Sequence, residues 1–332
     1  MVAVTRASLL KTLFAGTLST SFVSLPQQRN ESISEYSKYA SAANFVRHEI
    51  KSIIKKQDPT LAGPILRLAF HDATVRSIAD DPFIGGADGS IRYELDWSEN
   101  RGLSKPLKVV QEIFDLQKER FTTSDSSTSL SLSFADTLAL SGSAAVQAAK
   151  GPAIPIKLGR KDVNHADNRF LDKPIESETD RSRISTSLPS AALDSLGLRN
   201  YFKRLGLTEE ELVALSGAHD LGRHVTLTDM PKACLRNLTR TCLENAPVLT
   251  PFISKDPDTL SNNYFENMLR WNNREIKYGE ALFIPTDVTM VVDEGLRKYV
   301  TEYANDEKLF FARFTRGYQK MVESTATSTW RY

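Results

Sequence analysis

Apolar residues recur at intervals of three and four along most of this chain, and that period favours helices over strands. The clearest case spans residues 34–56, where one apolar face contains Tyr39, Ala43, Val46, Ile50 and Ile53. The same period predicts further helices over residues 104–121, 133–150, 187–206, 208–219, 262–273 and 306–322. The helix at 133–150 is rich in Ala, Ser and Gly, so we expect neighbouring helices to approach it closely. The chain is therefore predicted to be predominantly α.

Strand signals are few. Residues 151–159 (GPAIPIKLG) indicate a short extended segment, and residues 279–293 are predicted to contain a small hairpin. Residues 164–187 are polar and charged and follow no period, which is typical of a long surface loop. We expect two helical halves, residues 33–165 and 166–332, that meet near this loop.

The composition gives no sign of a nucleic-acid or membrane protein. Of the 332 residues, 41% are hydrophobic and 25% are charged, and the formal net charge is +1. Such a balance does not favour binding to nucleic acid or to anionic membranes. No run of about 18 apolar residues is present, so no membrane-spanning helix is predicted. Cys234 and Cys242 can form a disulfide or remain two ordinary thiols, and the oligomeric state is left open.

Residues 1–32 have the composition of a targeting segment and are left out of the fold prediction. They contain Arg6, Lys11 and Arg29, many Ser and Thr residues, and no acid before Glu31. This pattern is typical of an organellar transit peptide. The stretch LFAGTLSTSFVSLP can also serve as a secretory core, so a secreted location stays an alternative.

A cation and a base share one face of an otherwise apolar helix at residues 63–73 (GPILRLAFHDA). Arg67 and His71 are four residues apart, so both side chains point the same way. Placing two polar heads in an apolar interior costs free energy. This pair is therefore a candidate for chemistry.

A second histidine ends another apolar helix. Thr208 and Glu211 form a capping box at its start, and His219 closes its apolar stripe. Gly217 and Ala218 remove bulk beside His219, so we expect a large flat group to approach the helix end there. One neutral imidazole can bind haem iron from one side, while a histidine with an arginine acts on peroxide from the other.

At these residues the chain resembles the plant-type haem peroxidase superfamily, from about residue 40 to residue 322. The motifs are RLAFHDA, SFADTLALSGSAAVQAAKGPAIPIKLGRKD and VALSGAHDLGRH, in this order. The resemblance implies a two-domain fold with haem b between a distal and a proximal half, and reduction of H₂O₂ with oxidation of a small electron donor. It further implies roles for a set of residues: Arg67 and His71 as the distal catalytic pair, Phe70 as the aromatic residue over the haem, Asn100 and Glu94 in the hydrogen-bond network of the distal histidine, His219 as the iron ligand, and Asp287 as its carboxylate partner.

Three replacements indicate a particular branch of the superfamily. Phe252 and Phe70 stand where ascorbate and cytochrome c peroxidases carry tryptophan, and Thr228 stands where an arginine binds ascorbate. These features resemble the ascorbate-peroxidase-related proteins of plastids, in the class I group. The resemblance implies a plastid location and an electron donor other than ascorbate, such as a phenol.

One loop is similar to a different branch. The GGADGSI segment after the distal histidine resembles the distal calcium loop of class II fungal peroxidases, with Asp72, Gly86, Asp88 and Ser90 at the ligand positions. These oxygen donors suit one Ca²⁺. The alternative is a tight Gly-Asp-Gly turn without metal.

Two other functions remain as alternatives. The chain could keep the peroxidase fold without haem and act as a structural partner of another protein. It could also be a non-haem metal hydrolase that uses His219, Asp220 and His224. In the peroxidase interpretation, His224 and Arg223 are instead expected to contact the haem propionates.

Overall fold

The computed structural model describes residues 27–74, 86–97, 100–122, 130–164, 188, 193–225, 249–251, 256–273, 284–328 and 331–332, with side chains from residue 39 onward except at 224–225, 249–251 and 285. Helices make up most of these ranges, so the predicted predominantly α fold is confirmed. Within the described residues, no helix is both long and apolar enough to cross a membrane.

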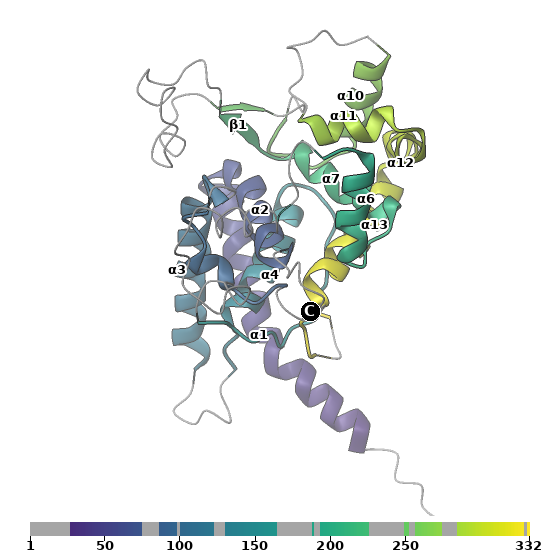
Figure 1. The fold of residues 1–332 in the computed structure, drawn as a ribbon. Coiled ribbons are helices and arrows are strands. Elements are labelled where there is room, and N and C mark those ends of the chain that lie inside the picture. Colours follow the sequence, from purple (N-terminus) through teal and green to yellow (C-terminus); the bar gives the residue numbers. More distant parts are fainter. Residues whose placement is uncertain are drawn as a thin grey trace, which may run out of the picture.

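The first group of helices is built around α4. It consists of α1 (Gln27–Lys56), α2 (Ala62–Thr74), α3 (Ser104–Phe121) and α4 (Phe134–Ala148), with the 3₁₀ turns η1 (Pro59–Leu61) and η2 (Ser90–Tyr93). Helices α1, α2 and α3 all contact α4 (Figure 1). A Cβ atom on Gly142 of α4 would lie 2.8 Å from the Cβ of Ala69 in α2. The close approach predicted from the small residues of α4 is therefore present.

The second group contains α6 (Ser195–Arg204), α7 (Glu209–Ser216), the 3₁₀ turn η5 (Gly217–Asp220), α10 (Asn263–Asn272), α11 (Pro285–Val292), α12 (Glu294–Asn305) and α13 (Glu307–Glu323). Its core is a cluster of buried rings in which Phe265 makes edge contacts with Tyr303 and Phe310. Helix α13 joins the two groups, because it contacts α7 and also α2 (Figure 1). The hydroxyl of Tyr318 in α13 donates to the carbonyl of Ala139 in α4 at 2.8 Å.

The strands of the structure lie outside the segments predicted to be extended. Strand β1 (Arg223–Val225) pairs antiparallel with β2 (Leu249–Pro251), with Arg223 opposite Pro251. Residues 151–159 contribute one bridge, between Lys157 and Arg331.

The predicted hairpin at 279–293 is wrong for residues 285–292, which form α11. Two helix-start signals explain the difference. Pro285 occupies the first turn, where its missing N–H costs nothing, and Asp287 Oδ2 accepts the backbone N–H of Ile284 at 3.0 Å.

Several predictions fall on residues outside the described ranges. They are the leader up to residue 26, the loop at 165–187 that contains the expected boundary between the halves, Thr228, Phe252 and the two cysteines. The division into 33–165 and 166–332 stays a prediction.

Candidate active site

Helix α2 places Arg67, Phe70 and His71 beside one another. Its apolar residues Ile65 and Leu68 are fully buried in the first helical group. His71 is also buried, with 8% of its surface exposed, whereas Phe70 is half-buried and Arg67 is exposed. The helix thus buries its apolar side and keeps Arg67 and part of Phe70 accessible.

The orientation of the His71 ring is fixed by Asn100. Asn100 Oδ1 lies 2.7 Å from His71 Nδ1, and Asn100 Nδ2 donates to the backbone carbonyl of Glu94 at 2.8 Å. Because the amide group of Asn100 has its donor committed to that carbonyl, its oxygen must accept from His71. The proton of a neutral His71 therefore resides on Nδ1, and Nε2 carries the lone pair. Glu94 enters this network through its main chain.

Burial and charge keep His71 neutral. Burial, with the neighbouring positive charge of Arg67, lowers the pKa of His71 to about 3, and the hydrogen bond with Asn100 opposes this shift. Desolvation also lowers the pKa of Arg67, to about 10, so the guanidinium stays protonated near neutral pH. Arg67 has accessible surface, but protein atoms surround it closely and its Nη1 donates to the carbonyl of Arg101 at 2.8 Å. A neutral base and a fixed cation lie together on α2.

The second histidine lies just past the end of an α-helix. The predicted capping box of Thr208 and Glu211 starts α7, which ends at Ser216, and His219 belongs to the 3₁₀ turn η5. A Cβ atom on Gly217 would lie 2.6 Å from the ring of Phe310. The lack of a side chain at Gly217 therefore admits this ring, and the expectation that Gly217 leaves room for a bound group is wrong.

His219 is held by a buried carboxylate from α11. Its Nδ1 donates to Asp287 Oδ1 at 2.8 Å, and Asp287 is fully buried while the His219 side chain is 32% exposed. With Nδ1 committed to the carboxylate, a metal would be bound by Nε2. Asp287 is 68 residues away in sequence, and the structure brings the two side chains together.

Sequence reasoning missed Tyr264. Its hydroxyl donates to Asp287 Oδ1 at 2.6 Å, so two donors meet at one carboxylate oxygen. The period of residues 262–273 places Tyr264 on a buried helix face, but no local signal indicates that its hydroxyl reaches Asp287. Burial and the nearby Asp287 raise the pKa of Tyr264 well above its usual range, so the phenol remains a donor.

The loop at residues 86–91 is organised around Asp72. Its carboxylate accepts the backbone N–H groups of Gly89 at 3.1 Å and Ile91 at 3.2 Å, and Gly89 has a φ of 77°, which favours glycine. Burial and the charges of Asp88 and Glu94 raise the pKa of Asp72 well above its usual value. Ser90 Oγ is buried and has no hydrogen-bond partner among the described residues.

Within the described residues, no three His, Cys, Asp or Glu side chains are arranged to hold a metal ion. Asp220, the middle member of the hydrolase alternative, accepts the N–H and the hydroxyl of Ser261 with its Oδ2, at 2.7 and 2.9 Å. This contact ties η5 to the segment before α10. The backbone of His224 lies in β1, but its side chain is outside the described part of the chain. Arg223 forms a bidentate pair with Asp258, both at 2.7 Å.

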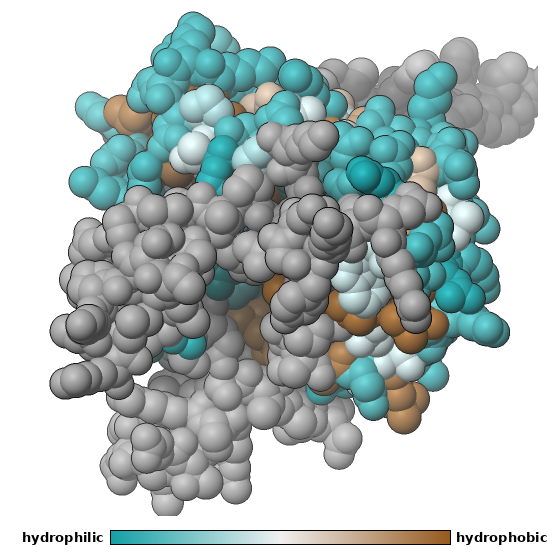
Figure 2. Space-filling model, turned by 90° about the horizontal axis from the view of Figure 1, so that it is seen from above, coloured by the Kyte–Doolittle hydropathy of each residue, from teal (hydrophilic) through white to brown (hydrophobic). Residues whose placement is uncertain are grey.

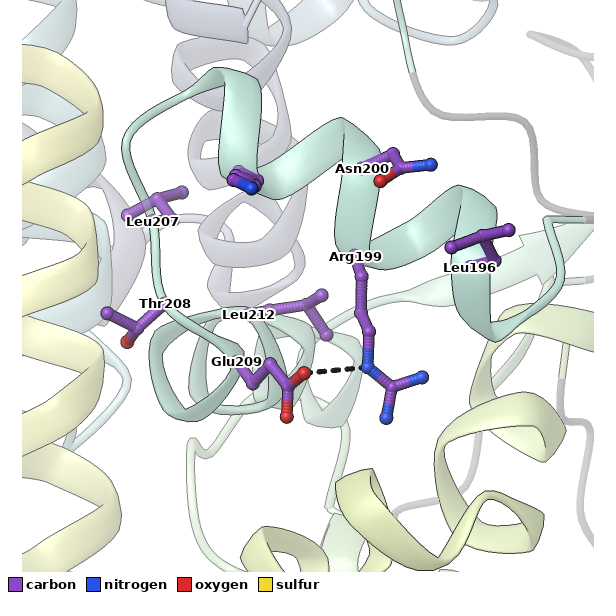
Figure 3. A pocket seen from close by; sticks show the side chains of 8 residues that line it. Leu196, Arg199, Asn200, Leu207, Thr208, Glu209 and Leu212 are labelled. Atoms are coloured by element: carbon purple, nitrogen blue, oxygen red, sulfur yellow. Dashed lines mark hydrogen bonds and ion pairs between the residues drawn. The ribbon is translucent and has the colours of Figure 1, made fainter.

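Seen from above, hydrophobic residues are visible near the middle of the molecule, while the outer parts of the described surface are mostly hydrophilic (Figure 2). A pocket lies between α6 and α7, where Arg199 points toward Glu209 (Figure 3). Arg199 pairs with Glu209 at 2.7 Å and with Asp293 at 2.6 Å, so its charge is already matched within the protein. Neither histidine lines the pocket between α6 and α7.

The sequence is similar to a known protein family and to several curated proteins. Residues 46–306 match the family model described as peroxidase. An Arabidopsis thaliana protein named among the L-ascorbate peroxidases is 32% identical over 286 residues, which cover 85% of this chain and 68% of that protein. An Oryza sativa protein named as a chloroplastic L-ascorbate peroxidase is 30% identical, over 86% of this chain and 54% of its own length, so the chain spans about half of it.

A third relative comes from a fungus. A Cryptococcus neoformans protein whose name describes a heme-binding peroxidase is 29% identical over 84% of this chain and 77% of that protein. Among further matching ascorbate peroxidases, some are named chloroplastic and others peroxisomal.

Proposed function

The chain belongs to the peroxidase family, and we propose that it reduces hydrogen peroxide at a bound haem b while it oxidises a small electron donor. One observation carries this proposal. Two histidines lie on neighbouring elements, α2 and η5, and each has its Nδ1 committed to a fixed partner, Asn100 or Asp287. In this proposal, the Nε2 atom of His219 binds the iron and the Nε2 atom of His71 acts on the peroxide.

The residues on the His219 side fit a haem. A histidine that donates to a buried carboxylate is a common iron ligand, since the carboxylate raises the basicity of the imidazole. His219 would hold the iron, and Asp287 would act through it as a positioning residue. When bound, the haem supplies the electrons with which the peroxide O–O bond is cleaved.

The residues on the His71 side fit peroxide. Neutral His71 accepts a proton from the peroxide at Nε2 and returns it to the departing oxygen, so that water leaves. Arg67 stabilises the negative charge that develops on that oxygen, because its guanidinium stays charged. Asn100 is a positioning residue that keeps the lone pair of His71 on Nε2.

The electron donor is proposed to be a phenol or a similar small reductant. Thr228, which replaces the arginine that binds ascorbate, and Phe252, which replaces the tryptophan of ascorbate and cytochrome c peroxidases, support this choice through the sequence alone. The names of the plant relatives favour ascorbate instead. Steady-state rates with each donor decide between them, and rapid, saturable turnover of ascorbate would contradict the phenolic donor.

We propose that the Asp72 loop is a turn without calcium. The support is the geometry of Asp72, because both oxygens already accept backbone N–H groups, as expected for the Gly-Asp-Gly alternative. The buried Ser90 Oγ and the adjacent acids are the features that favour a cation.

A plastid location is the proposal most compatible with residues 1–32. Their basic composition, with no acid before Glu31, and the chloroplastic names of several relatives support it. Fluorescence of a fusion between residues 1–32 and a reporter tests the location, and a secreted or peroxisomal signal would contradict it.

An absorption spectrum of the protein expressed with a haem supply tests the central claim. We expect a Soret band in the wild type and its loss in His219→Ala. A wild-type protein that binds no haem would contradict the enzyme and favour the alternative of a haem-free structural partner.

A further inference from the structure

We propose that Tyr264 is a positioning residue that weakens the hydrogen bond between His219 and Asp287 and thereby sets the reduction potential of the haem iron. This inference rests on the proposed function, since it concerns the residue that would bind the iron. It assigns a role to a fully buried side chain.

Both hydrogen bonds end on the same atom. Tyr264 Oη donates to Asp287 Oδ1 at 2.6 Å, and His219 Nδ1 donates to the same oxygen at 2.8 Å. The other oxygen, Oδ2, accepts the backbone N–H of Ile284 at 3.0 Å. The ring planes of His219 and Tyr264 are nearly perpendicular, at 80°, with their centres 6.1 Å apart.

The phenol is held firmly in this place. Tyr264 and Asp287 are both fully buried, so water does not compete for the shared oxygen. The Tyr264 ring packs edge-on against Phe265 at 4.9 Å, and Phe265 in turn contacts Tyr303 and Phe310. The hydrogen bond is short and belongs to the buried core of the second helical group.

Two donors at one oxygen compete for the same electron density. The phenol withdraws charge from Oδ1, so the carboxylate pulls less strongly on the proton of His219. Without the phenol, the imidazole would have more anionic character and would donate more charge to the iron. That change stabilises the ferric over the ferrous state, so the potential falls.

Tyr264→Phe is the direct test, because it removes only the hydroxyl. We expect the Fe(III)/Fe(II) potential to shift to a more negative value and the Fe(II)–imidazole stretching frequency, measured by resonance Raman, to rise. Asp287→Asn removes the carboxylate itself and is expected to shift both quantities the opposite way. If Tyr264 had only a structural role, Tyr264→Phe and Asp287→Asn would not be expected to shift the potential and the stretching frequency in opposite directions.

Tyr303→Phe is the matched control. Tyr303 is as deeply buried and belongs to the same ring cluster, but its hydroxyl donates to the backbone carbonyl of Glu210 at 2.7 Å. Loss of this hydroxyl should leave the potential unchanged. An equal shift in the two tyrosine variants would contradict the inference, as would an unchanged or more positive potential in Tyr264→Phe.

A second substitution keeps the inference testable if Tyr264→Phe does not fold or does not bind haem. Site-specific 3,5-difluorotyrosine at position 264 keeps the ring and strengthens the donor, so the potential should rise. An unchanged or lower potential would contradict the inference. Failure of the wild-type protein to bind haem would overturn the proposed function, whereas normal haem binding without these shifts would overturn only the role of Tyr264.

Discussion

Gly63, in the first turn of α2, lies directly against Gly222, which follows the turn that carries His219. A Cβ atom on residue 63 would stand 3.1 Å from Gly222 Cα and 3.0 Å from the carbonyl oxygen of Leu221. The contact joins backbone to backbone, and the N–H of Gly222 is itself bonded to the carbonyl of Pro257 at 3.0 Å. The contact between Gly63 and Gly222 therefore fixes the separation between the segments that carry His71 and His219.

Gly63→Ala should disturb this spacing. The new methyl group would press on main-chain atoms that cannot rotate away, so we expect a loss of about 1–3 kcal/mol in the free energy of unfolding. Haem affinity should fall as well, because the two histidines would move apart. Chemical denaturation and a haem titration measure the two effects.

Gly295→Ala is the control for that substitution. A Cβ atom on residue 295 would meet mainly the end of the Arg199 side chain, at 2.8 Å. Gly295 is also far from both histidines in the sequence. Equal losses of stability and haem affinity in the two variants would contradict a specific role for Gly63.

His71 should make the stability depend on pH. Its pKa in the folded protein is about 3, below the ordinary value of 6.5, so the unfolded chain binds more protons between these values. The contribution is present above pH 6.5 and is lost toward pH 3, at about 1.4 kcal/mol per pH unit. From pH 7 to about pH 4.5, the wild type should lose about 2.5 kcal/mol more stability than His71→Gln. Urea unfolding at the two pH values measures this, and parallel losses would contradict a buried neutral His71.

Arg67→Leu should slow the reaction with peroxide without loss of haem. Removal of one preorganised charge typically costs about 100-fold in rate. Stopped-flow mixing with H₂O₂ measures the second-order rate constant. The rate constant of Arg67→Lys should lie between those of the wild type and Arg67→Leu, because lysine keeps the positive charge but lacks the planar guanidinium group. An unchanged rate in Arg67→Leu would show that Arg67 does not act on peroxide.

Asp136→Asn should strongly destabilise the fold. Asp136 Oδ1 pairs with Arg160 Nη1 at 2.7 Å, both side chains are almost fully buried, and Arg160 also donates to the carbonyl of Val322 at 2.8 Å. Burial raises the pKa of Asp136 despite this partner, so the pair itself is costly. Loss of the carboxylate would leave a buried cation unpaired, at a cost of about 3–5 kcal/mol.

The pair between Asp258 and Arg223 provides the comparison. It is bidentate, but its side chains are 27% and 20% exposed. Asp258→Asn should cost only about 1 kcal/mol or less. Equal losses in thermal or urea unfolding would show that burial is not what makes Asp136 important.

Calcium should leave the thermal stability unchanged. If the N–H groups of Gly89 and Ile91 are the hydrogen-bond partners that the Asp72 carboxylate needs, the midpoint temperature of unfolding will be the same in calcium and in a chelator. A bound ion at 100 times its Kd would add about 2.7 kcal/mol. A midpoint several degrees higher in calcium, abolished by Asp88→Asn, would contradict the turn without metal.

Local signals in the sequence determined the helices and their ends. The apolar period placed α3 at residues 104–121, and the capping box of Thr208 and Glu211 started α7, because both depend on residues within a few positions of each other. The pair of Arg67 and His71 was also readable locally, since a spacing of four residues places both on one helix face. The hairpin predicted at 279–293 was wrong for residues 285–292, because the prediction gave more weight to the apolar run than to the helix-start signals of Pro285 and Asp287.

Only the tertiary structure decided which distant groups meet. The contacts of Asn100 with His71, of Tyr264 with Asp287 and of Gly63 with Gly222 join residues 23–159 positions apart. No local period encodes such contacts, because they depend on how whole helices pack. The sequence by itself therefore determined the helical segments and the two candidate histidines. The position of Asn100 beside α2 decided the tautomer of His71, and the packing of α10 and α11 beside η5 decided the partner of His219 and the presence of Tyr264 at the same carboxylate oxygen.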